Sequence, residues 1–126
     1  MLSDEDERWP LALFDDCFPG RMGMSDCDGI FERKGKFLLL EFKRPGARVP
    51  TAHKIMLTSF ARLPGCSALL VFCEAPCAPT EDLEDVSAFD EQACTWQTFG
   101  ADAKTQEGTL GALKDSIREW YAWAVS

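Results

Sequence analysis

The chain has 126 residues, of which 46% are hydrophobic, and it carries a formal net charge of −8. This length fits a single domain over residues 1–126 that can bury a core, and no apolar run reaches the roughly 20 residues of a membrane-spanning helix. The acidic amino terminus lacks the basic and apolar regions of a signal peptide. We therefore expect a cytoplasmic protein with no membrane partner.

The six cysteines do not change this expectation. No two of them have the two-residue spacing of a zinc knuckle, and Cys27, Cys66 and Cys73 lie in apolar surroundings. Free cysteine in such surroundings behaves as a small hydrophobe, and cytosolic proteins rarely form disulfides. The pattern therefore favours reduced, structural thiols.

The first predicted element is a helix over about Asp4–Asp16, with a restart at Trp9-Pro10. Ser3 can cap this helix, and the acidic residues of its first turn suit the positive end of a helix dipole. Phe18-Pro19-Gly20 ends it, and Arg21–Met24 is a weaker candidate for a short leading strand. This helix therefore precedes the strands that carry the chemistry.

Two strands follow, over about Asp26–Arg33 and Lys36–Lys43, with Lys34-Gly35 as the turn between them. The numbers of paired residues then sum to 69, so Asp28 faces Glu41 and Asp26 faces Lys43. Facing side chains have Cβ atoms about 4.5–5.5 Å apart, and strand alternation places all four side chains on one face. A three-residue turn would shift this pairing.

The second strand is apolar at Phe37–Leu40 and Phe42, which predicts burial on both faces. Glu41 and Lys43 are the charges at its end. A buried charge is costly unless something pairs with it, and two carboxylates that face each other repel. Asp28 and Glu41 therefore predict a cation between them, for which Mg²⁺ is the usual hard ion.

The next predicted elements form a strand–helix–strand crossover. Pro45 and Pro50 cannot continue a central strand, and Thr51 is a good helix cap. The helix ends at Pro64-Gly65, and Ser67–Cys73 reads as another buried strand, parallel to the previous one. The apolar residues at helical spacing are Ile55, Met56, Phe60 and Leu63.

The last third of the chain predicts three further segments. Glu74–Glu91 is acidic and lacks a clear period, which is typical of a flexible excursion. Cys94–Phe99 reads as a strand at a sheet edge, and Thr109–Ala124 reads as the closing helix. The apolar residues of that helix recur at helical spacing: Leu110, Leu113, Ile117, Trp120 and Tyr121.

Charge is distributed unevenly along the chain. Between Ile30 and Arg62 the segment carries +6, and the rest of the chain carries −14. Such asymmetry can mark a basic face on an acidic protein that binds nucleic acid. An equally plain interpretation is that Arg33, Lys34 and Lys36 solvate the tip of the hairpin.

The order helix, hairpin, helix, strand, together with Asp-x12-Glu-x-Lys, resembles the PD-(D/E)XK nuclease superfamily. Glu41-Phe42-Lys43 matches the D/E-x-K element, and Asp28 stands at the family aspartate. The family's Pro-Asp dipeptide is absent, so Asp26 is the other candidate. The resemblance covers Ser25–Phe72 and implies a restriction-endonuclease-like α/β fold, in which a mixed central sheet carries the hairpin between flanking helices.

The resemblance implies a Mg²⁺-dependent nuclease that hydrolyses phosphodiester bonds of DNA, with RNA not excluded. Asp28, Glu41 and the backbone carbonyl of Phe42 would hold Mg²⁺, or Mn²⁺ as a substitute, with Asp26 as a further candidate ligand. Lys43 would orient or deprotonate the attacking water. Endonuclease and exonuclease activity both remain open.

Basic residues after the hairpin are the expected phosphate contacts of this nuclease. They are Arg44, Arg48, His53 and Lys54, and the family's polar residue at the start of the following helix corresponds to His53 or Lys54. An acidic residue of the first helix joins the metal site in some members. The candidates for that role are Glu5, Glu7, Asp15 and Asp16.

Three other interpretations stand beside the nuclease. Glu41 and Lys43 can form a salt bridge at a strand edge, with no catalytic role. A protein of the same fold without chemistry can serve as a subunit or inhibitor of a nucleic-acid-processing complex, which suits the small, acidic chain. The motif can also occur by chance in an unrelated α/β domain.

If the protein cuts duplex DNA, two copies are expected, because one catalytic domain cuts one strand at a time.

Overall fold

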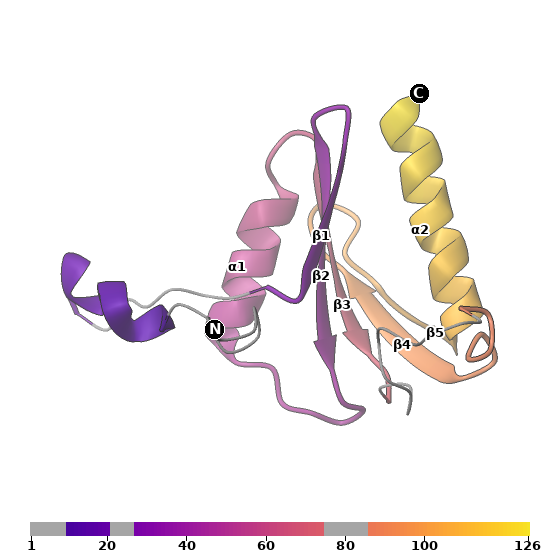
Figure 1. Cartoon of the computed structure of the whole chain (residues 1–126), viewed down its shortest axis with the longest axis horizontal. Helices are drawn as coiled ribbons and strands as arrows, with labels where there is room; N and C mark the ends of the chain where they lie inside the picture. Colours follow the sequence, from indigo (N-terminus) through magenta and orange to yellow (C-terminus); the bar gives the residue numbers. More distant parts are fainter. Residues whose placement is uncertain (1–9, 21–26, 75–85) are drawn as a thin grey trace, which may run out of the picture.

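Five strands form one mixed sheet in the order β1-β2-β3-β4-β5, with helices on both of its faces (Figure 1). A computed structural model of the chain describes residues 10–20, 27–74 and 86–126. The strands are β1 (Gly29–Arg33), β2 (Lys36–Lys43), β3 (Cys66–Phe72), β4 (Ala93–Thr98) and β5 (Thr105–Thr109). The helices are η1 (Leu11–Cys17), a 3₁₀-helix, α1 (Thr51–Ala61) and α2 (Leu110–Val125). The predicted α/β class and mixed sheet are therefore confirmed.

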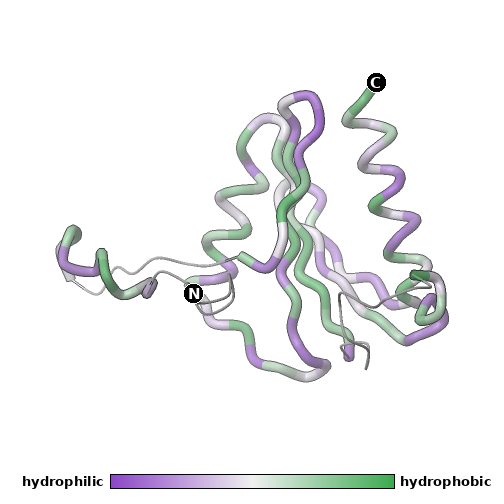
Figure 2. The backbone as a smooth tube through the Cα atoms, in the orientation of Figure 1, coloured by the Kyte–Doolittle hydropathy of each residue, from purple (hydrophilic) through white to green (hydrophobic). Residues whose placement is uncertain are grey.

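The alternating side chains of β2 divide the core into two layers. Leu38 and Leu40 belong to the cluster that contains Leu113 of α2, whereas Leu39 belongs to the cluster that contains Leu57 of α1. Even-numbered residues of β2 therefore face α2, and odd-numbered residues face α1. Figure 2 shows the hydrophobic residues along the middle of the sheet and hydrophilic residues at the hairpin tip.

The β1–β2 hairpin has the predicted turn and register. Lys34 and Gly35 have φ values of 52° and 79°, and a two-residue turn of this kind matches the twist of its flanking strands. The paired residues run from Arg33 opposite Lys36 to Gly29 opposite Leu40. The predicted sum of 69 is therefore confirmed for every pair of this ladder.

The crossover from β2 through α1 to β3 is also confirmed, because β2 and β3 are parallel, with Leu39 opposite Ala68. The predicted cap of α1 is wrong. Pro50 occupies the cap position without a side-chain hydrogen bond, and Thr51 is the first helical residue. The fixed φ of Pro50 suits the entrance to a helix, so the chain enters α1 without a capping side chain.

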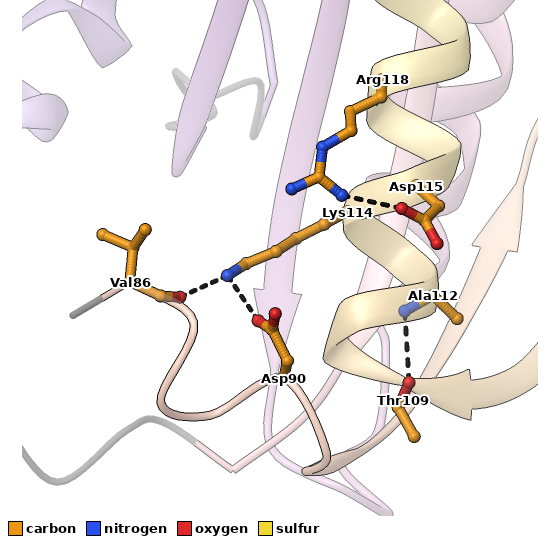
Figure 3. Close-up of polar contacts among 7 residues, drawn as sticks. All are labelled: Val86, Asp90, Thr109, Ala112, Lys114, Asp115 and Arg118. Carbon is orange, nitrogen blue, oxygen red and sulfur yellow. Dashed lines mark hydrogen bonds and ion pairs between the residues drawn. The ribbon is translucent and has the colours of Figure 1, made fainter.

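Helix α2 is anchored at its start by polar contacts (Figure 3). The Thr109 hydroxyl accepts a hydrogen bond from the Ala112 amide at 3.2 Å, so Thr109 caps the helix as an N-cap threonine does. Lys114 forms an ion pair with Asp90 at 2.6 Å and also donates to the Val86 carbonyl. The segment before β4 is thereby attached to the first turns of α2.

The other end of α2 receives the hairpin tip. Lys34 and Lys36 each donate to a carbonyl of the last helical turn, those of Val125 and Ala124, both at 3.2 Å. Lys36 also lies 4.8 Å from the centre of the Trp123 ring, and Arg33 lies 5.8 Å from that of Tyr121. The three basic residues thus complement the negative end of the helix dipole rather than only facing solvent.

Replacing Lys36 by methionine should lower the free energy of unfolding by about 1 kcal/mol, because a helix C-cap contact and a cation–π contact are lost. Urea unfolding followed by circular dichroism measures this change. The matched control is Lys54→Met, which changes an exposed lysine of α1 and should cost less than about 0.5 kcal/mol. Equal effects in the two variants would contradict a stabilising role for the hairpin tip.

The predicted burial of β2 on both faces is wrong at the two ends of the strand. Leu38 to Leu40 are buried, but Phe37 is exposed and Phe42 is 48% exposed. The apolar run is longer than the part of the strand that the two helices cover, so its ends reach solvent. Ile55 and Leu63, two of the apolar residues at helical spacing, are exposed as well, and Leu63 lies beyond the end of α1.

The prediction of an edge position for Cys94–Phe99 is also wrong. The strand is β4, and it lies inside the sheet because β5 pairs with it in antiparallel register. β5 reads Thr-Gln-Glu-Gly-Thr, and a polar edge strand of this kind carries no apolar alternation in its sequence. Much of the predicted first helix, the strand at Arg21–Met24 and most of the acidic excursion lie outside the described residues.

Within the parts of the chain that the structure describes, no helix is both long enough and apolar enough to cross a membrane. Helix η1 ends at Cys17, directly before the predicted stop at Phe18-Pro19-Gly20. It lies apart from the sheet, beyond α1 in Figure 1. Because η1 lies apart from the sheet, the candidate site is formed by the other elements at that end, namely β1, β2, β3 and α1.

Candidate metal and phosphate site

The candidate site lies at the end of the sheet where β2 ends and where α1 begins (Figure 1). Loop residues 44–50 connect these two elements, so the last residues of β2 and the first turn of α1 are near one another in the chain. Parallel pairing places the end of β3 at the same edge. Functional sites of parallel α/β sheets form at such carboxyl ends of strands.

Glu41 is the charged residue of β2 that the sheet encloses. Its side chain is 5% exposed, and among the described residues it is the only charged side chain that is buried. As an odd-numbered residue of β2 it lies on the face that α1 covers, next to Leu70 of β3. An apolar sheet has no packing reason to place a carboxylate there.

Asp28 lies one residue before β1, and continuing the register by one residue places it opposite Glu41. Its carboxylate accepts a hydrogen bond from the Phe42 amide at 2.7 Å. This bond joins the residue before β1 to the end of β2 and fixes one oxygen of Asp28 beside the Glu41-Phe42 peptide. The Asp28 side chain is thus attached to the end of β2, at the residue that directly follows Glu41.

The Phe42 carbonyl points toward the same neighbour as the Phe42 amide, because the N–H and C=O of one strand residue point to the same side. That amide donates to Asp28, whereas the carbonyl of the next residue, Lys43, accepts from Cys73 of the β3 side. The Phe42 carbonyl is therefore directed toward the Asp28 side of β2.

Lys43 follows Glu41 by two residues and lies on the same face of β2, half-buried. Its backbone carbonyl, which accepts the Cys73 amide at 3.0 Å, fixes the strand from which the ammonium extends.

The two candidates at the start of α1 point in different directions. His53 lies one turn before Leu57, on the side of α1 that packs on the sheet, and its Nδ1 is buried with no hydrogen-bond partner among the described residues. Lys54 is exposed on the outer side. Of the two, His53 is the residue that the helix turns toward the face carrying Glu41.

The remaining candidate ligands are not brought to the site. Asp26, Glu5 and Glu7 lie outside the described residues. Asp15 and Asp16 are exposed on η1, which lies apart from the sheet (Figure 1). In the residues that the structure describes, no group of three or more His, Cys, Asp or Glu side chains is arranged to hold a metal ion. Of the predicted ligands, Asp28, Glu41 and the Phe42 carbonyl therefore lie within the described residues.

The phosphate candidates belong to a longer basic segment than the sequence motif indicated. Between Phe42 and Glu74 the chain has five Lys or Arg residues and no Asp or Glu. Arg44 and Arg48 are exposed on the loop before α1. The outer face of α1 also forms an open groove of about 250 Å³ lined by Lys54, Ile55, Thr58, Ser59 and Arg62.

Thr58, Ser59 and Arg62 were not among the predicted site residues. Their signal in the sequence is helical spacing, since Lys54, Thr58 and Arg62 follow one another at intervals of four and thus share one face. Cations and hydroxyl groups on a shared face are the groups that contact phosphate oxygens. A basic face therefore runs from the loop after β2 along the outside of α1.

No family model matches the chain, and comparison with curated proteins and with solved structures finds no similar protein.

Proposed function

We propose that the protein is a Mg²⁺-dependent nuclease that hydrolyses phosphodiester bonds of DNA, with Asp28, Glu41 and Lys43 as its catalytic residues. The observation that carries the proposal is Glu41, a carboxylate buried in an otherwise apolar sheet. Asp28 accepts the amide of the next residue, Phe42, and a half-buried lysine follows Glu41 by two residues. In a strand with only a structural role, this combination of buried charged groups would cost stability.

The donor atoms suit a small hard cation. Asp28 and Glu41 offer carboxylate oxygens from adjacent strands, and the Phe42 carbonyl is directed to the same side. Mg²⁺ prefers oxygen ligands and is usually held by one or two carboxylates, with waters and substrate phosphates completing its shell. When bound, such an ion polarises a phosphate and lowers the pKa of a water molecule.

Other residues of the site would then have separate roles in catalysis and in binding the substrate. The Lys43 ammonium offsets negative charge that develops on the scissile phosphate and orients the attacking water. Arg44, Arg48 and Lys54 hold the flanking phosphates, and His53 lies on the inner side of α1, toward the reacting group. The apolar residues around Glu41 limit the access of other water molecules.

Binding to DNA should depend on salt through the basic face. Replacing Arg48 or Lys54 by alanine should lower affinity for a short duplex roughly five- to tenfold at about 0.1 M salt and reduce the slope of log affinity against log salt by about one. Fluorescence anisotropy in EDTA measures both, without cleavage. Lys104→Ala, an exposed lysine outside the basic segment, should leave the slope unchanged. Equal losses in all three variants would contradict a defined phosphate surface.

The second candidate is a non-catalytic protein of this fold that serves as a subunit or inhibitor of a nucleic-acid-processing complex. The exposed apolar residues of the β1 edge, Ile30 and Phe31, favour it. An edge strand with unpaired backbone groups and apolar side chains is a ready surface for a partner strand. A second copy at this edge would form a homodimer.

One experiment separates the two candidates. The purified chain is incubated with linear, nicked and branched DNA, and with RNA of the same sequences, in Mg²⁺, Mn²⁺ or EDTA. Cleavage that requires the metal supports the nuclease, and the substrates cut identify its specificity. Absence of cleavage on every substrate, together with no heat of Mg²⁺ or Mn²⁺ binding by calorimetry, supports the interaction protein.

A further inference from the structure

Two cysteines face each other across β3 and β4. The last pair of this antiparallel ladder joins Phe72 to Thr95, so the next position along the register joins Cys73 to Cys94. Both thiols belong to the apolar cluster on the α2 side of the sheet. Residues directly opposite in antiparallel strands have Cα atoms about 4.5–5.5 Å apart, within the roughly 4.4–6.8 Å that a disulfide spans.

The two thiols already contact one another. They share a side-chain hydrogen bond, and this contact, after burial, is part of what raises the pKa of Cys94 to about 12. Cys94 is 4% exposed, whereas Cys73 is only half-buried. The Gln92 side-chain amide donates to the Cys73 sulfur at 3.3 Å, and the Cys73 thiol donates to the Ala93 carbonyl at 3.5 Å, so this sulfur is held in place beside β4.

We propose that Cys73 and Cys94 form a reversible disulfide when the protein meets a hydroperoxide. The backbone needs no rearrangement for this bond, because the register already brings the two residues together. Cys73 is the thiol that reacts first, since it is half-buried whereas Cys94 is fully enclosed, so the peroxide reaches Cys73 more readily. Cys94 is the resolving thiol.

The chemistry balances with the peroxide as the oxidant. The Cys73 sulfur attacks one peroxide oxygen, the O–O bond breaks, and a sulfenic acid and one water form. The Cys94 sulfur then attacks the Cys73 sulfur, the S–O bond breaks, and the hydroxide leaves with the Cys94 proton as a second water. Two thiols are oxidised to one disulfide, and one hydrogen peroxide is reduced to two waters.

The position of the pair gives the bond a structural consequence. The Cys73 amide holds the Lys43 carbonyl at the end of β2, and Cys94 lines an open cavity of about 450 Å³ beneath loop residues 45–47. A disulfide here links β3 to β4 at the sheet end that also carries the candidate site. It closes a chain loop over the segment from Cys73 to Cys94, which restricts the unfolded state.

The test oxidises the folded full-length chain with hydrogen peroxide and maps its thiols by mass spectrometry. Trypsin leaves Cys73, Cys77 and Cys94 on one peptide, because no Lys or Arg lies between Arg62 and Lys104. Cleavage after glutamate separates all three, at Glu74, Glu81, Glu84 and Glu91. The expected product is a crosslinked pair of peptides, lacking two hydrogen atoms, that join Cys73 to Cys94.

Dithiothreitol should restore both thiols, and the oxidised protein should melt about 5–10 °C higher than the reduced protein. Cys73→Ser and Cys94→Ser should each abolish the crosslink. Cys66→Ala, on the same strand but with its side chain on the opposite face, should retain it. The proposal is overturned if Cys73 pairs with Cys77, or if Cys73 gains oxygen atoms while Cys94 remains a free thiol.

Discussion

Replacing Glu41 by glutamine should reduce Mg²⁺-dependent cleavage of DNA by at least about 100-fold, because the variant loses the buried carboxylate that would hold the ion. Glutamine has nearly the same volume, so the packing against Leu70 is kept. Initial rates on a fluorescent duplex measure the loss. Asp28→Asn and Lys43→Met should each lower the rate by a similar factor.

The matched control for this change is Glu32→Gln, which makes the same substitution in the same hairpin. Glu32 is exposed, and its carboxylate accepts the Gly35 amide at 2.9 Å, a role that an amide oxygen can retain. The Glu32→Gln variant should cleave DNA at a rate within about twofold of that of the parent protein. Cleavage that persists undiminished in Glu41→Gln and Lys43→Met would place the reaction elsewhere on the protein.

Calorimetry separates the loss of metal from the loss of chemistry. Glu41→Gln and Asp28→Asn should weaken Mg²⁺ binding, whereas Lys43→Met should leave it nearly intact, because an ammonium is not a metal ligand. A thermal melt of each variant shows that it is folded. Equal Mg²⁺ binding by parent and Glu41→Gln would exclude Glu41 as a ligand.

The hairpin was predictable from sequence because its register depends on local features. Lys34-Gly35 is a two-residue turn in which both residues have positive φ, and the turn fixes every pair up to Gly29 and Leu40. Continuing the register by one residue predicts Asp28 opposite Glu41, and the structure shows the Asp28 carboxylate bound to the Phe42 amide. The crossover was predictable for a related reason, since prolines before α1 and a glycine after it mark its ends.

Features that depend on tertiary packing could not be predicted in this way. β5 is recognisable as a strand only through its pairing with β4, since its five residues carry no apolar alternation. The contacts of Lys34 and Lys36 join residues about 90 positions apart, which a local charge pattern cannot indicate. Likewise, the sequence alone could not show which of His53 and Lys54 lies toward the sheet, because that depends on the side of α1 that packs on it.

Helix α1 shows the same limit at the level of a single core residue. The sequence predicts Ile55 as part of its apolar face, yet Ile55 is 61% exposed, and Leu57 is the residue of this helix that is fully buried. A neighbouring apolar stripe of α1 lies at positions 56, 57 and 60. The sheet packs against this stripe, and Ile55 remains on the outside, where it lines the basic groove.

Replacing Leu57 by alanine should therefore lower the free energy of unfolding by about 3 kcal/mol, in the range of large-to-small changes in a packed core. Leu57 packs with Leu39 and Leu70, the neighbours of Glu41 on this face, so the cavity opens beside the candidate site. Ile55→Ala, two residues away on the same helix, should cost less than about 1 kcal/mol. Urea unfolding of both variants measures the difference. If the two costs are equal, α1 does not cover the face that carries Glu41, and the enclosure on which the site depends is lost with it.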